Sequence, residues 1–559
     1  MGNNDEESET KFALPRPFSL LSSLIPVLAA TLLLALPILS LVYIAASGDF
    51  ESLNHIMKNV VPRAAQTTLF LLLGVGIFVA VTGTLTAWLV AFYDFPFRNQ
   101  LQWALMLPFA VPTYISAYAF VEFFSFTGPL QSIVRDIGGY TTSKEYWFPE
   151  IRSLWGASLI MGLVLYPYVY LAVRTLFRFQ AAHLVDSARI LGARSSRLLF
   201  AITLPMARPA IILGVTLALM ETLNDIGAVE HLGVHTLTFS IFSVWLNQSD
   251  LPGAAQISLL LLIIVLALIS IERLSRGARK FYAGRISNKV APPDRQRLSG
   301  WQAICALIAC LTPVILGFGI PVFVLASYAI DRVFEVNLVV LLSSLATSVV
   351  LGIFAAFVTV VIGLFLSFAA RSNSGILTAI FVRIACSGYA IPGTLIALGL
   401  FLPIASFDNH VDAFMRSTLG ISTGLLVTGS GAIMIFAYVI RFMTMAEGNL
   451  TNGFGRLSPN LDMAGRNLGR NRKQVIHSIL LPLLWPAIIS ASLLVFVEVV
   501  KELSATIMLR PFGMNTLATH VYDYASQARI EDAAIGCLLI ILVGMLPVVF
   551  LLAKDETKL

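Results

Sequence analysis

Asp186-Ser187-Ala188-Arg189-Ile190-Leu191-Gly192, followed by Thr203-Leu204-Pro205, is a polar stretch between two apolar runs. It returns as Met463-Ala464-Gly465-Arg466-Asn467-Leu468-Gly469, followed by Leu480-Leu481-Pro482. In both copies the glycine lies six residues after the first position, and the proline lies thirteen residues after the glycine. A polar element kept at one spacing in two parts of an apolar chain indicates an internal repeat that contacts something outside the membrane.

The composition is that of a membrane protein. Hydrophobic residues make up 57% of the 559 residues and charged residues only 12%, whereas a soluble domain carries about 25% charged residues. The apolar runs reach the about 20 residues that a membrane-spanning helix needs, and packed bundles tolerate the Gly and Pro within them. We therefore predict an all-α polytopic membrane protein with about twelve spans. They are expected at residues 18–46, 66–93, 101–125, 154–175, 209–229, 254–272, 301–328, 340–369, 376–402, 420–440, 484–508 and 533–553.

The basic residues gather in three loops, 180–208, 273–297 and 447–473, whereas residues 230–253 contain no Lys or Arg. Short basic loops stay in the cytoplasm, so topology explains the formal charge of +6 better than nucleic-acid binding does. With twelve spans, the three basic loops and both termini lie on the cytoplasmic side. The acidic, polar start lacks the basic segment of a secretory signal, and we expect residues 1–17 to form a cytosolic tail.

The polar and basic segment 273–300 divides the chain into a first transmembrane domain, 18–272, and a second, 301–559. Several short motifs occur in both, namely Pro108–Thr113 with Tyr389–Thr394, Glu221–Asp225 with Glu498–Glu502, and His235-Thr236-Leu237 with Asn515-Thr516-Leu517. Six spans in each half make the halves parallel repeats about an axis along the membrane normal. This predicts one central path between two similar six-helix bundles, with both polar cassettes on the cytoplasmic face.

Within each cassette, residues 184–191 and 461–468 place apolar side chains three and four positions apart, which indicates a short amphipathic helix. The following glycine can adopt a positive φ and end that helix. The Leu-Pro pair then suits the first turn of the next span. A helix that merely anchors the loop to the membrane would show the same pattern, but two copies at matched spacing favour a docking element.

These cassettes resemble the EAA loop of ABC-importer permeases, which reads Glu-Ala-Ala, three residues, Gly, nine residues and Ile-x-Leu-Pro. The resemblance implies transmembrane domains of the type I ABC-importer kind, in which each loop forms a coupling helix seated on a separate ATPase subunit. The residues it assigns to coupling are Asp186, Ser187, Ala188, Gly192 and Pro205 in the first copy, and Asp462, Met463, Ala464, Gly469 and Pro482 in the second. The second copy departs from the pattern because Met463 takes the acidic position. Asp462 can compensate, since a helix start favours a carboxylate.

The fused two-times-six arrangement, with Tyr389–Leu398, Glu221–Gly227 and Lys501–Pro511, resembles the ferric-iron permeases of bacterial periplasmic-binding-protein systems. The resemblance implies a permease of the bacterial inner membrane that works with two ATPase copies and a periplasmic binding protein. Thiamine and 2-aminoethylphosphonate permeases share much of this pattern, so these cargoes are alternatives. A secondary transporter driven by an ion gradient and a non-transporting scaffold are the candidates from other classes.

We expect no enzymatic activity, cofactor or resident metal in this chain. No Gly-x4-Gly-Lys-Ser/Thr loop is present to hold nucleotide phosphates, so ATP would be used by the partner subunit. The four cysteines all lie inside predicted spans, where free cysteine usually packs as a small apolar residue. His231 and His235 lie four residues apart with no third ligand nearby, so a solvated pair is a better interpretation than a metal site.

Charged and polar residues near the outer ends of two spans are the candidates for the translocation pathway. They are Glu221, Asn224 and Asp225, and Glu498, Lys501 and Glu502. A charge at the membrane centre costs roughly 2.5–3.5 kcal/mol on insertion scales, so these side chains should face a cavity. Our hypothesis is that they line the outer part of the path, where carboxylates attract a trivalent cation. The structural alternative is that Lys501 pairs with acids across the two halves and holds them together.

Overall fold

The computed structural model describes residues 17–556, apart from residues 49, 180–187, 189, 192–196, 277–294, 373–374 and 459. Within these residues, eleven helices are long and apolar enough to cross a membrane. A twelfth span is formed if the bent pair Arg98–Ala110 and Thr113–Gly138 is counted as one. The expectation of an α-helical polytopic protein with about twelve spans is therefore confirmed.

The first half contains the elements up to the end of the sixth span. They are α1 (Pro17–Ala46), α2 (Phe50–Asn59), α3 (Val61–Phe92), β1 (Tyr93–Asp94), α4 (Arg98–Ala104), η1 (Leu107–Ala110), α5 (Thr113–Phe124), α6 (Pro129–Gly138), α7 (Leu154–Phe179), η2 (Leu198–Thr203), α10 (Leu204–Asn224), α11 (Ile226–His231), α12 (Leu237–Phe242), η3 (Ser243–Asn247) and α13 (Leu251–Arg276).

The second half repeats this order. Its elements are β2 (Gln296–Arg297), α14 (Trp301–Val314), η4 (Ile315–Gly319), α15 (Ile320–Arg332), α16 (Leu338–Ser372), α17 (Ile376–Ala385), η5 (Gly388–Ala390), α18 (Gly393–Leu419), α19 (Ala432–Gly455), α20 (Asn460–Asn467), α21 (Arg472–Val475), η6 (Ile476–Leu480), α22 (Leu481–Lys501), α23 (Ser504–Leu509), α24 (Leu517–Ser526) and α25 (Ile530–Glu556).

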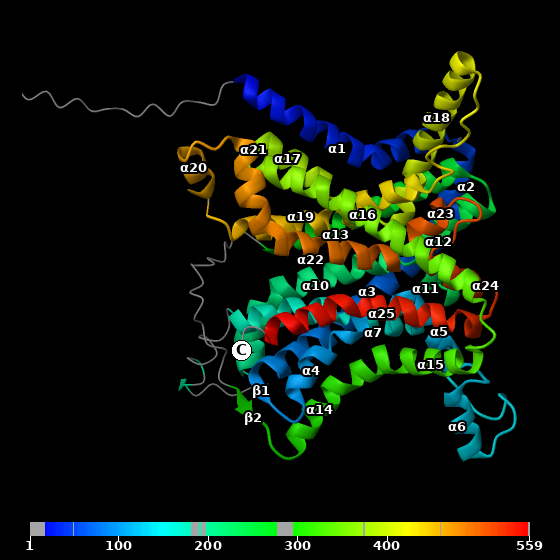
Figure 1. The fold of residues 1–559 in the computed structure, drawn as a ribbon. Coiled ribbons are helices and arrows are strands. Elements are labelled where there is room, and N and C mark those ends of the chain that lie inside the picture. The colour runs from blue at the N-terminus through cyan, green and yellow to red at the C-terminus, as the bar shows by residue number, and fades with distance from the viewer. Residues whose placement is uncertain are drawn as a thin grey trace, which may run out of the picture.

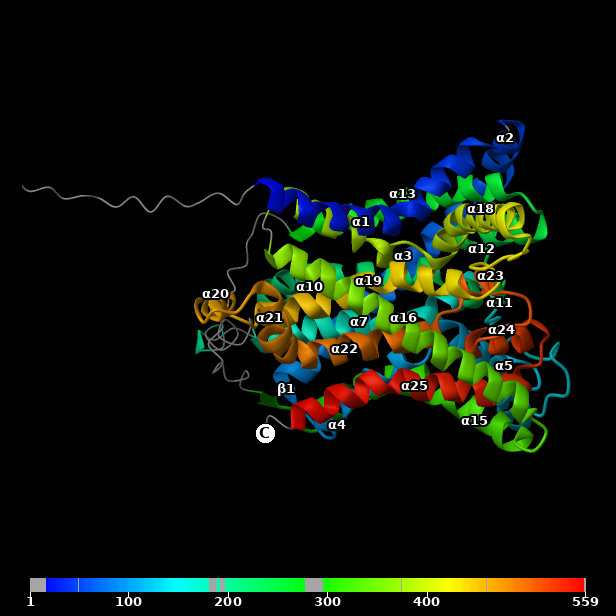
Figure 2. The same ribbon diagram turned by 45° about the horizontal axis from the view of Figure 1, so that its top comes forward.

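The long helices of both halves run between two ends of the molecule (Figure 1). The start of α1, helix α20 and the end of α25 lie at one end, and α2, α6 and α24 lie at the other (Figures 1 and 2). The described parts of both termini are therefore on the same side as the second cassette, which is what an even number of spans requires.

The first span of each half packs against the opposite half. Helix α1 contacts α17 and α18, while α14, η4 and α15 contact α4, α5 and α7. Two glycines allow the backbones to approach closely at these crossings. A Cβ on Gly399 would lie 2.3 Å from the carbonyl oxygen of Pro37, and a Cβ on Gly317 would lie 2.6 Å from that of Leu163. The first span of each half is therefore packed into the other half, and the two halves interlock.

The internal repeat extends to individual hydrogen bonds. The Thr236 side chain caps α12 by accepting from the Phe239 N–H, and Thr516 caps α24 by accepting from the Thr519 N–H. The residue after each threonine donates its N–H to a hydroxyl on a neighbouring long helix. Leu237 donates to Thr68 on α3, and Leu517 donates to Ser348 on α16. Equivalent motifs therefore form equivalent local structures.

Proline positions explain three wide helical turns. The π-helical turns η2, η4 and η6 each end two residues before a proline, at Pro205, Pro321 and Pro482. A proline ring clashes with the carbonyl four residues earlier and has no N–H to donate, and a π-turn at this position changes the hydrogen-bond register. The Leu-Pro pair lies in the first turn of α10 and of α22, as predicted. The helical path itself starts earlier, through η2 in the first half and through α21 and η6 in the second.

Other predicted spans have different boundaries in the structure. The spans 101–125 and 376–402 are broken, because Val111 and Ile391 are extended ahead of a proline, as expected for a residue in that position. The first break bends the chain by 93°. The predicted spans 209–229 and 484–508 end earlier, at Asn224 and Lys501.

The predicted span 420–440 begins only at Ala432. The carboxylates of Asp408 and Asp412 on α18 accept backbone N–H groups of Val427, Thr428, Thr423 and Gly424. Backbone groups satisfied by side chains in this way do not need a helix. The segment before α19 is therefore a loop tied to α18.

One small sheet is an exception to the all-α expectation. Strands β1 and β2 pair in parallel, with Tyr93 opposite Gln296 and Asp94 opposite Arg297. This pairing attaches the end of the linker between the halves to the end of α3.

Candidate functional site

The candidate site is a cavity of about 90 Å³ between the two halves. Six of its lining residues are those predicted for the pathway, which are Glu221, Asn224, Asp225, Glu498, Lys501 and Glu502. Its wall also contains Phe109, Thr113, Tyr114, Val164, Tyr168, Arg441 and Leu503. The structure thus brings together all six polar residues that the sequence singled out in separate halves.

The ends of α10 and α22 position these side chains. Each long helix stops near the cavity, and a short helix, α11 or α23, starts within three residues. The first N–H groups of a helix have no partner within it, so a carboxylate at this point both satisfies them and favours the helix dipole. Asp225 and Glu502 supply that carboxylate in the two halves.

Asp225 is held by neutral donors. One of its oxygens accepts from the backbone N–H of Ala228 at 2.9 Å, and the other accepts from the Thr113 hydroxyl. Thr113 begins α5, directly after the break at Pro112. The bent third span and the broken fifth span of the first half are therefore joined at this carboxylate.

The Glu502 carboxylate is held partly by the positively charged side chain of Arg441. Its two oxygens accept from the backbone N–H groups of Ala505 at 2.9 Å and Thr506 at 3.0 Å, and from the Thr506 hydroxyl at 2.5 Å. Arg441 on α19 adds a donor at 3.1 Å. The Glu502 side chain is 1% exposed, so this carboxylate is fully occupied by protein donors.

Arg441 connects the two halves. Besides Glu502, its guanidinium donates to the Asn224 side-chain oxygen at 2.6 Å and lies 3.8 Å from a Glu221 oxygen. Asn224 also accepts from the Gly393 N–H at 2.7 Å. The sequence-based prediction missed Arg441 because the span containing it was expected to end at residue 440, whereas α19 continues to Gly455. An arginine inside the apolar run that starts at Ile433 was the available signal.

The Glu221 carboxylate and two tyrosine hydroxyls form a row of neighbouring oxygen atoms. It accepts a hydrogen bond from the Tyr389 hydroxyl at 2.6 Å, and that hydroxyl lies 3.2 Å from the Tyr168 hydroxyl. Tyr389 belongs to η5 of the second half, at the position that Phe109 occupies in the first. Neither tyrosine was predicted as a site residue.

Among the residues that the structure describes, Lys501 forms no ion pair between the halves, which the structural alternative required. Its ammonium lies 3.5 Å from Glu498, three residues earlier on the same helix. Across the interface it reaches only the Phe109 carbonyl oxygen, at 3.4 Å, and the Phe109 ring, whose centroid is 5.0 Å away. Arg441 makes the ion pair between the halves instead.

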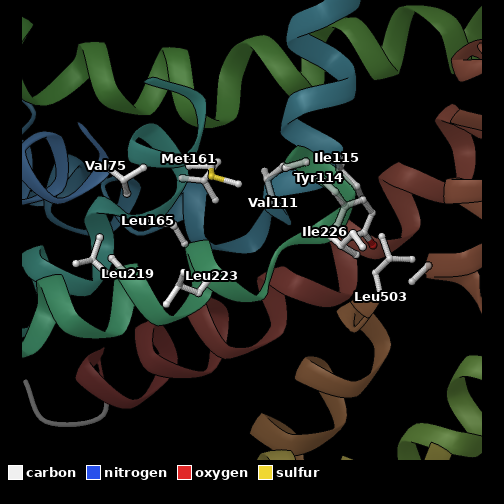
Figure 3. Close-up of a cluster of buried hydrophobic side chains, with 14 of the residues drawn as sticks. Val75, Val111, Tyr114, Ile115, Met161, Leu165, Leu219, Leu223, Ile226 and Leu503 are labelled. Atoms are coloured by element: carbon white, nitrogen blue, oxygen red, sulfur yellow. The ribbon is translucent and has the colours of Figure 1, made fainter. Parts of the chain in front are cut away.

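A cluster of buried apolar side chains lies next to the polar residues, and some of its members also line the cavity (Figure 3). Val111, Tyr114, Ile226 and Leu503 are buried in the same region, and Figure 3 shows Tyr114 and Ile226 of the first half beside Leu503 of the second. These apolar neighbours lower the local dielectric constant, which strengthens the interactions between the charges beside them.

The second cassette forms the expected short helix. It is α20, which Gly469 follows with a φ of 80°, and Met463 on it is 60% exposed. Ala464 is exposed as well, and Pro482 lies in the first turn of α22. The Asp462 side chain is outside the part of the chain that the structure describes.

Part of the first cassette lies outside the described residues, namely Asp186, Ser187 and Gly192. Ala188 is half-buried, and Pro205 lies in the first turn of α10. The beginning of α10 and helix α20 are at the same end of the molecule (Figure 1).

The two histidines do not converge. The ring of His231 packs edge-on against Tyr118 at 4.6 Å, and that of His235 packs against Phe239 at 4.9 Å. Among the residues that the structure describes, no three His, Cys, Asp or Glu side chains are grouped as metal ligands would be.

Comparison with known proteins agrees with this architecture. Residues 73–280 match the family described as binding-protein-dependent transport system inner membrane component. Over 94% of its length the chain is 25% identical to the Fe(3+)-transport system permease protein FbpB 2 of Haemophilus influenzae, of which 96% is covered. Over 44% of its length it is 28% identical to the sulfate transport system permease protein CysT of Salmonella typhimurium, of which 90% is covered. A 2-aminoethylphosphonate transport system permease protein, PhnU, of the same organism is 26% identical over 34% of the chain and 68% of its own length.

Two interlocked helical bundles meet at one polar cavity, which is an architecture suited to a membrane permease. By these matches, the chain is similar to permeases of binding-protein-dependent ABC importers, in residues 73–280 to the family model and along almost its whole length to the Fe(3+)-transport permease.

Proposed function

We propose that this permease carries ferric iron across the bacterial inner membrane. The observation that carries the proposal is similarity along almost the whole chain, both halves included, to a permease named for Fe(3+) transport. The matches to the sulfate and 2-aminoethylphosphonate permeases cover less than half of the chain.

The charge of the cavity supports a cation as cargo. Four carboxylates and two cationic side chains line it, which leaves an excess of negative charge. Inside a low-dielectric wall such an excess attracts cations and repels anions. Sulfate would meet unfavourable charge here, and so would the phosphonate group of 2-aminoethylphosphonate.

Energy would come from two copies of a separate ATPase subunit, one seated at each cassette. Exposed apolar side chains at this end support a protein partner, since such surfaces commonly mark interaction sites. Met463 is 60% exposed and Leu468 is 81% exposed, and in the first cassette Ile190 and Leu191 are both 87% exposed. A ligand shifts a conformational equilibrium only through its differential affinity, so ATP-driven closure of the ATPases would select one arrangement of the two bundles.

The end that carries α20 would face the cytoplasm, with both termini. A periplasmic binding protein would deliver the cargo to the opposite end, and lipid would surround the spans. The basic side chains near α20, such as Arg470, support this orientation, because positively charged loops remain inside.

Radiolabelled ferric iron uptake tests the cargo. Cells that contain the chain with its binding protein and ATPase should accumulate iron, and cells that lack only this chain should not. Excess sulfate or 2-aminoethylphosphonate should leave the uptake unchanged. Inhibition by either anion, or equal iron uptake without the chain, would contradict the proposal.

Co-purification with the ATPase subunit tests the coupling role. Met463→Asp places a charge on the exposed face of α20 and should reduce the amount of ATPase that co-purifies. Phe512→Asp is the matched control, because Phe512 is fully exposed in the loop between α23 and α24, and α24 lies at the opposite end of the molecule (Figure 1). Equal recovery of the ATPase with both variants would exclude α20 as its docking element.

A further inference from the structure

Oxygen atoms from both halves meet at the wall of the central cavity, where Tyr168 and Glu221 line the cavity and the Tyr389 hydroxyl contacts both of them. The hydroxyl groups of Tyr168 and Tyr389 lie 3.2 Å apart, and the Glu221 oxygen lies 2.6 Å from the second of them. Tyr168 and Glu221 belong to the first half and Tyr389 to the second. A ligand bound to these three groups would therefore touch both moving parts of the permease.

The carboxylates of the cavity differ in their freedom to bind a cargo. Asp225 and Glu502 are held by backbone N–H groups at the starts of α11 and α23, and Glu502 is 1% exposed. Glu221 and Glu498 are 21% and 14% exposed, and neither caps a helix. Glu221 and Glu498 are therefore the carboxylates available to a transient ligand.

We propose that Tyr168, Tyr389 and Glu221, with Glu498 beside them, form a transient binding site for a hard trivalent cation in transit. The proposal rests on the proposed function, since it names where the permease itself would hold ferric iron. Carboxylate oxygens are among the ligands that hard cations prefer, and phenolate oxygens have the same hard character. Two tyrosines beside carboxylates suit a trivalent ion better than they suit a sulfate or a phosphonate.

Arg441 is the internal counter-ion of this site. It lies 3.8 Å from Glu221, and its guanidinium also holds Asn224 and Glu502. Buried carboxylates without a compensating charge are costly, so the arginine stabilises them while no cargo is present. An arriving cation competes for Glu221 and weakens the contact that joins the two halves.

Two further polar atoms in the wall have no hydrogen-bond partner among the described residues. They are the hydroxyl of Tyr114, a residue that is 4% exposed, and Nε of Arg441, a residue that is 6% exposed. Both residues line the cavity. Buried polar atoms normally have partners, so both atoms are available to a polar occupant of the cavity.

Binding of the ion is an exchange of ligands, in which protons and bonds balance. Each phenol that binds the ion loses its proton to solvent, and the hydrogen bond from Tyr389 to Glu221 is replaced by bonds from both oxygens to the same cation. No oxidation or reduction occurs in this step.

Absorption spectroscopy of the purified full-length chain tests the site without transport. Ferric iron is added as its nitrilotriacetate complex, and a visible phenolate-to-iron charge-transfer band is expected. Tyr389→Phe and Tyr168→Phe should each remove or strongly weaken the band, and Glu221→Gln should lower the iron affinity at least about tenfold. Tyr166→Phe is the matched control, since Tyr166 is a fully buried tyrosine on the same helix α7 whose hydroxyl has no hydrogen-bond partner among the described residues, unlike the linked hydroxyls of Tyr168 and Tyr389.

The possible results separate this site from the proposed function. Iron uptake by the intact importer without any band in the wild-type chain would overturn the site and leave the importer standing. Absence of iron uptake would overturn the proposed function. A band that persists in both tyrosine variants, or that Tyr166→Phe also removes, would likewise overturn the assignment. The melting temperatures of Tyr168→Phe and Tyr389→Phe should equal that of Tyr166→Phe. This would show that the loss of the band is not caused by unfolding.

Discussion

The ends of α10 and α22 are equivalent in sequence position and in backbone, but their charges are compensated differently. In the first half, Asp225 is held by a hydroxyl and a backbone N–H. In the second half, Glu502 is held by backbone N–H groups, a hydroxyl and the guanidinium of Arg441. Helix α7 contributes no cation to the cavity wall where α19 contributes Arg441.

This difference shows that the repeat preserves the backbone framework while the charge is distributed unequally. The helix break needs a carboxylate in both halves, because the first N–H groups of α11 and α23 require acceptors. The cation is needed once, at the interface, where it serves Glu221 of one half and Glu502 of the other. A single arginine therefore bridges the two halves.

The largest effect is expected from Arg441→Met. This change leaves Glu502, which is 1% exposed, without its counter-ion, and breaking a buried ion pair by removing one partner costs about 3–5 kcal/mol. Thermal unfolding of the purified protein should show a clear loss of stability and of iron uptake. Arg416→Met is the control, because Arg416 pairs with Asp412 at the exposed end of α18 and surface pairs contribute about 0–1 kcal/mol. Equal effects of the two substitutions would contradict the central role of Arg441.

Neutralising the equivalent carboxylates one at a time should show that the charge in the second half contributes more to stability than the charge in the first. Glu502→Gln leaves Arg441 without its main buried partner, and hydrogen bonds to charged groups contribute about 1.5–3 kcal/mol each. Asp225→Asn retains an oxygen acceptor for neutral donors, so its cost should be about 1 kcal/mol. Chemical or thermal unfolding of both variants measures the difference. A larger cost for Asp225→Asn would mean that the charge asymmetry is not reflected in stability.

The interlocking of the halves predicts a steric effect at Gly399. Gly399→Val places a side chain against the Pro37 carbonyl oxygen, 2.3 Å from the added Cβ, and overpacking typically costs about 1–3 kcal/mol. Gly448→Ala is the control, since no atom lies within 4 Å of a Cβ added there. Both variants are compared by melting temperature, and a stability of Gly399→Val equal to that of the control would show that α1 can move away from α18.

The smallest effects are expected at the equivalent helix caps. Loss of a threonine cap costs about 1 kcal/mol, so Thr236→Ala and Thr516→Ala should both lower the melting temperature slightly. Thr516→Ala should cost more, because Thr516 and Thr519 cap each other reciprocally and only a single cap bond is formed by Thr236. A larger loss for Thr236→Ala would reverse this comparison.

Errors in the sequence-based prediction concern boundaries and partners. The twelve spans, the repeat and the six polar cavity residues were recognised, because each depends on local composition or on spacing. The breaks at Pro112 and Pro392 were missed, since proline alone does not distinguish a kink from a break in a bundle. Arg441 was missed because its importance depends on the position of α19 beside Glu221 and Glu502, which are distant in sequence.

Apolar run length, motif spacing and backbone chemistry were enough to predict the membrane class, a span count of about twelve, the repeat and the glycine that ends α20. The tertiary structure alone decided that α1 and α15 cross to the opposite half, that Arg441 joins the two halves, and that two tyrosine hydroxyls meet Glu221. Such pairings depend on contacts between residues more than a hundred positions apart, and no local pattern encodes which of the available charges will face each other in the folded bundle.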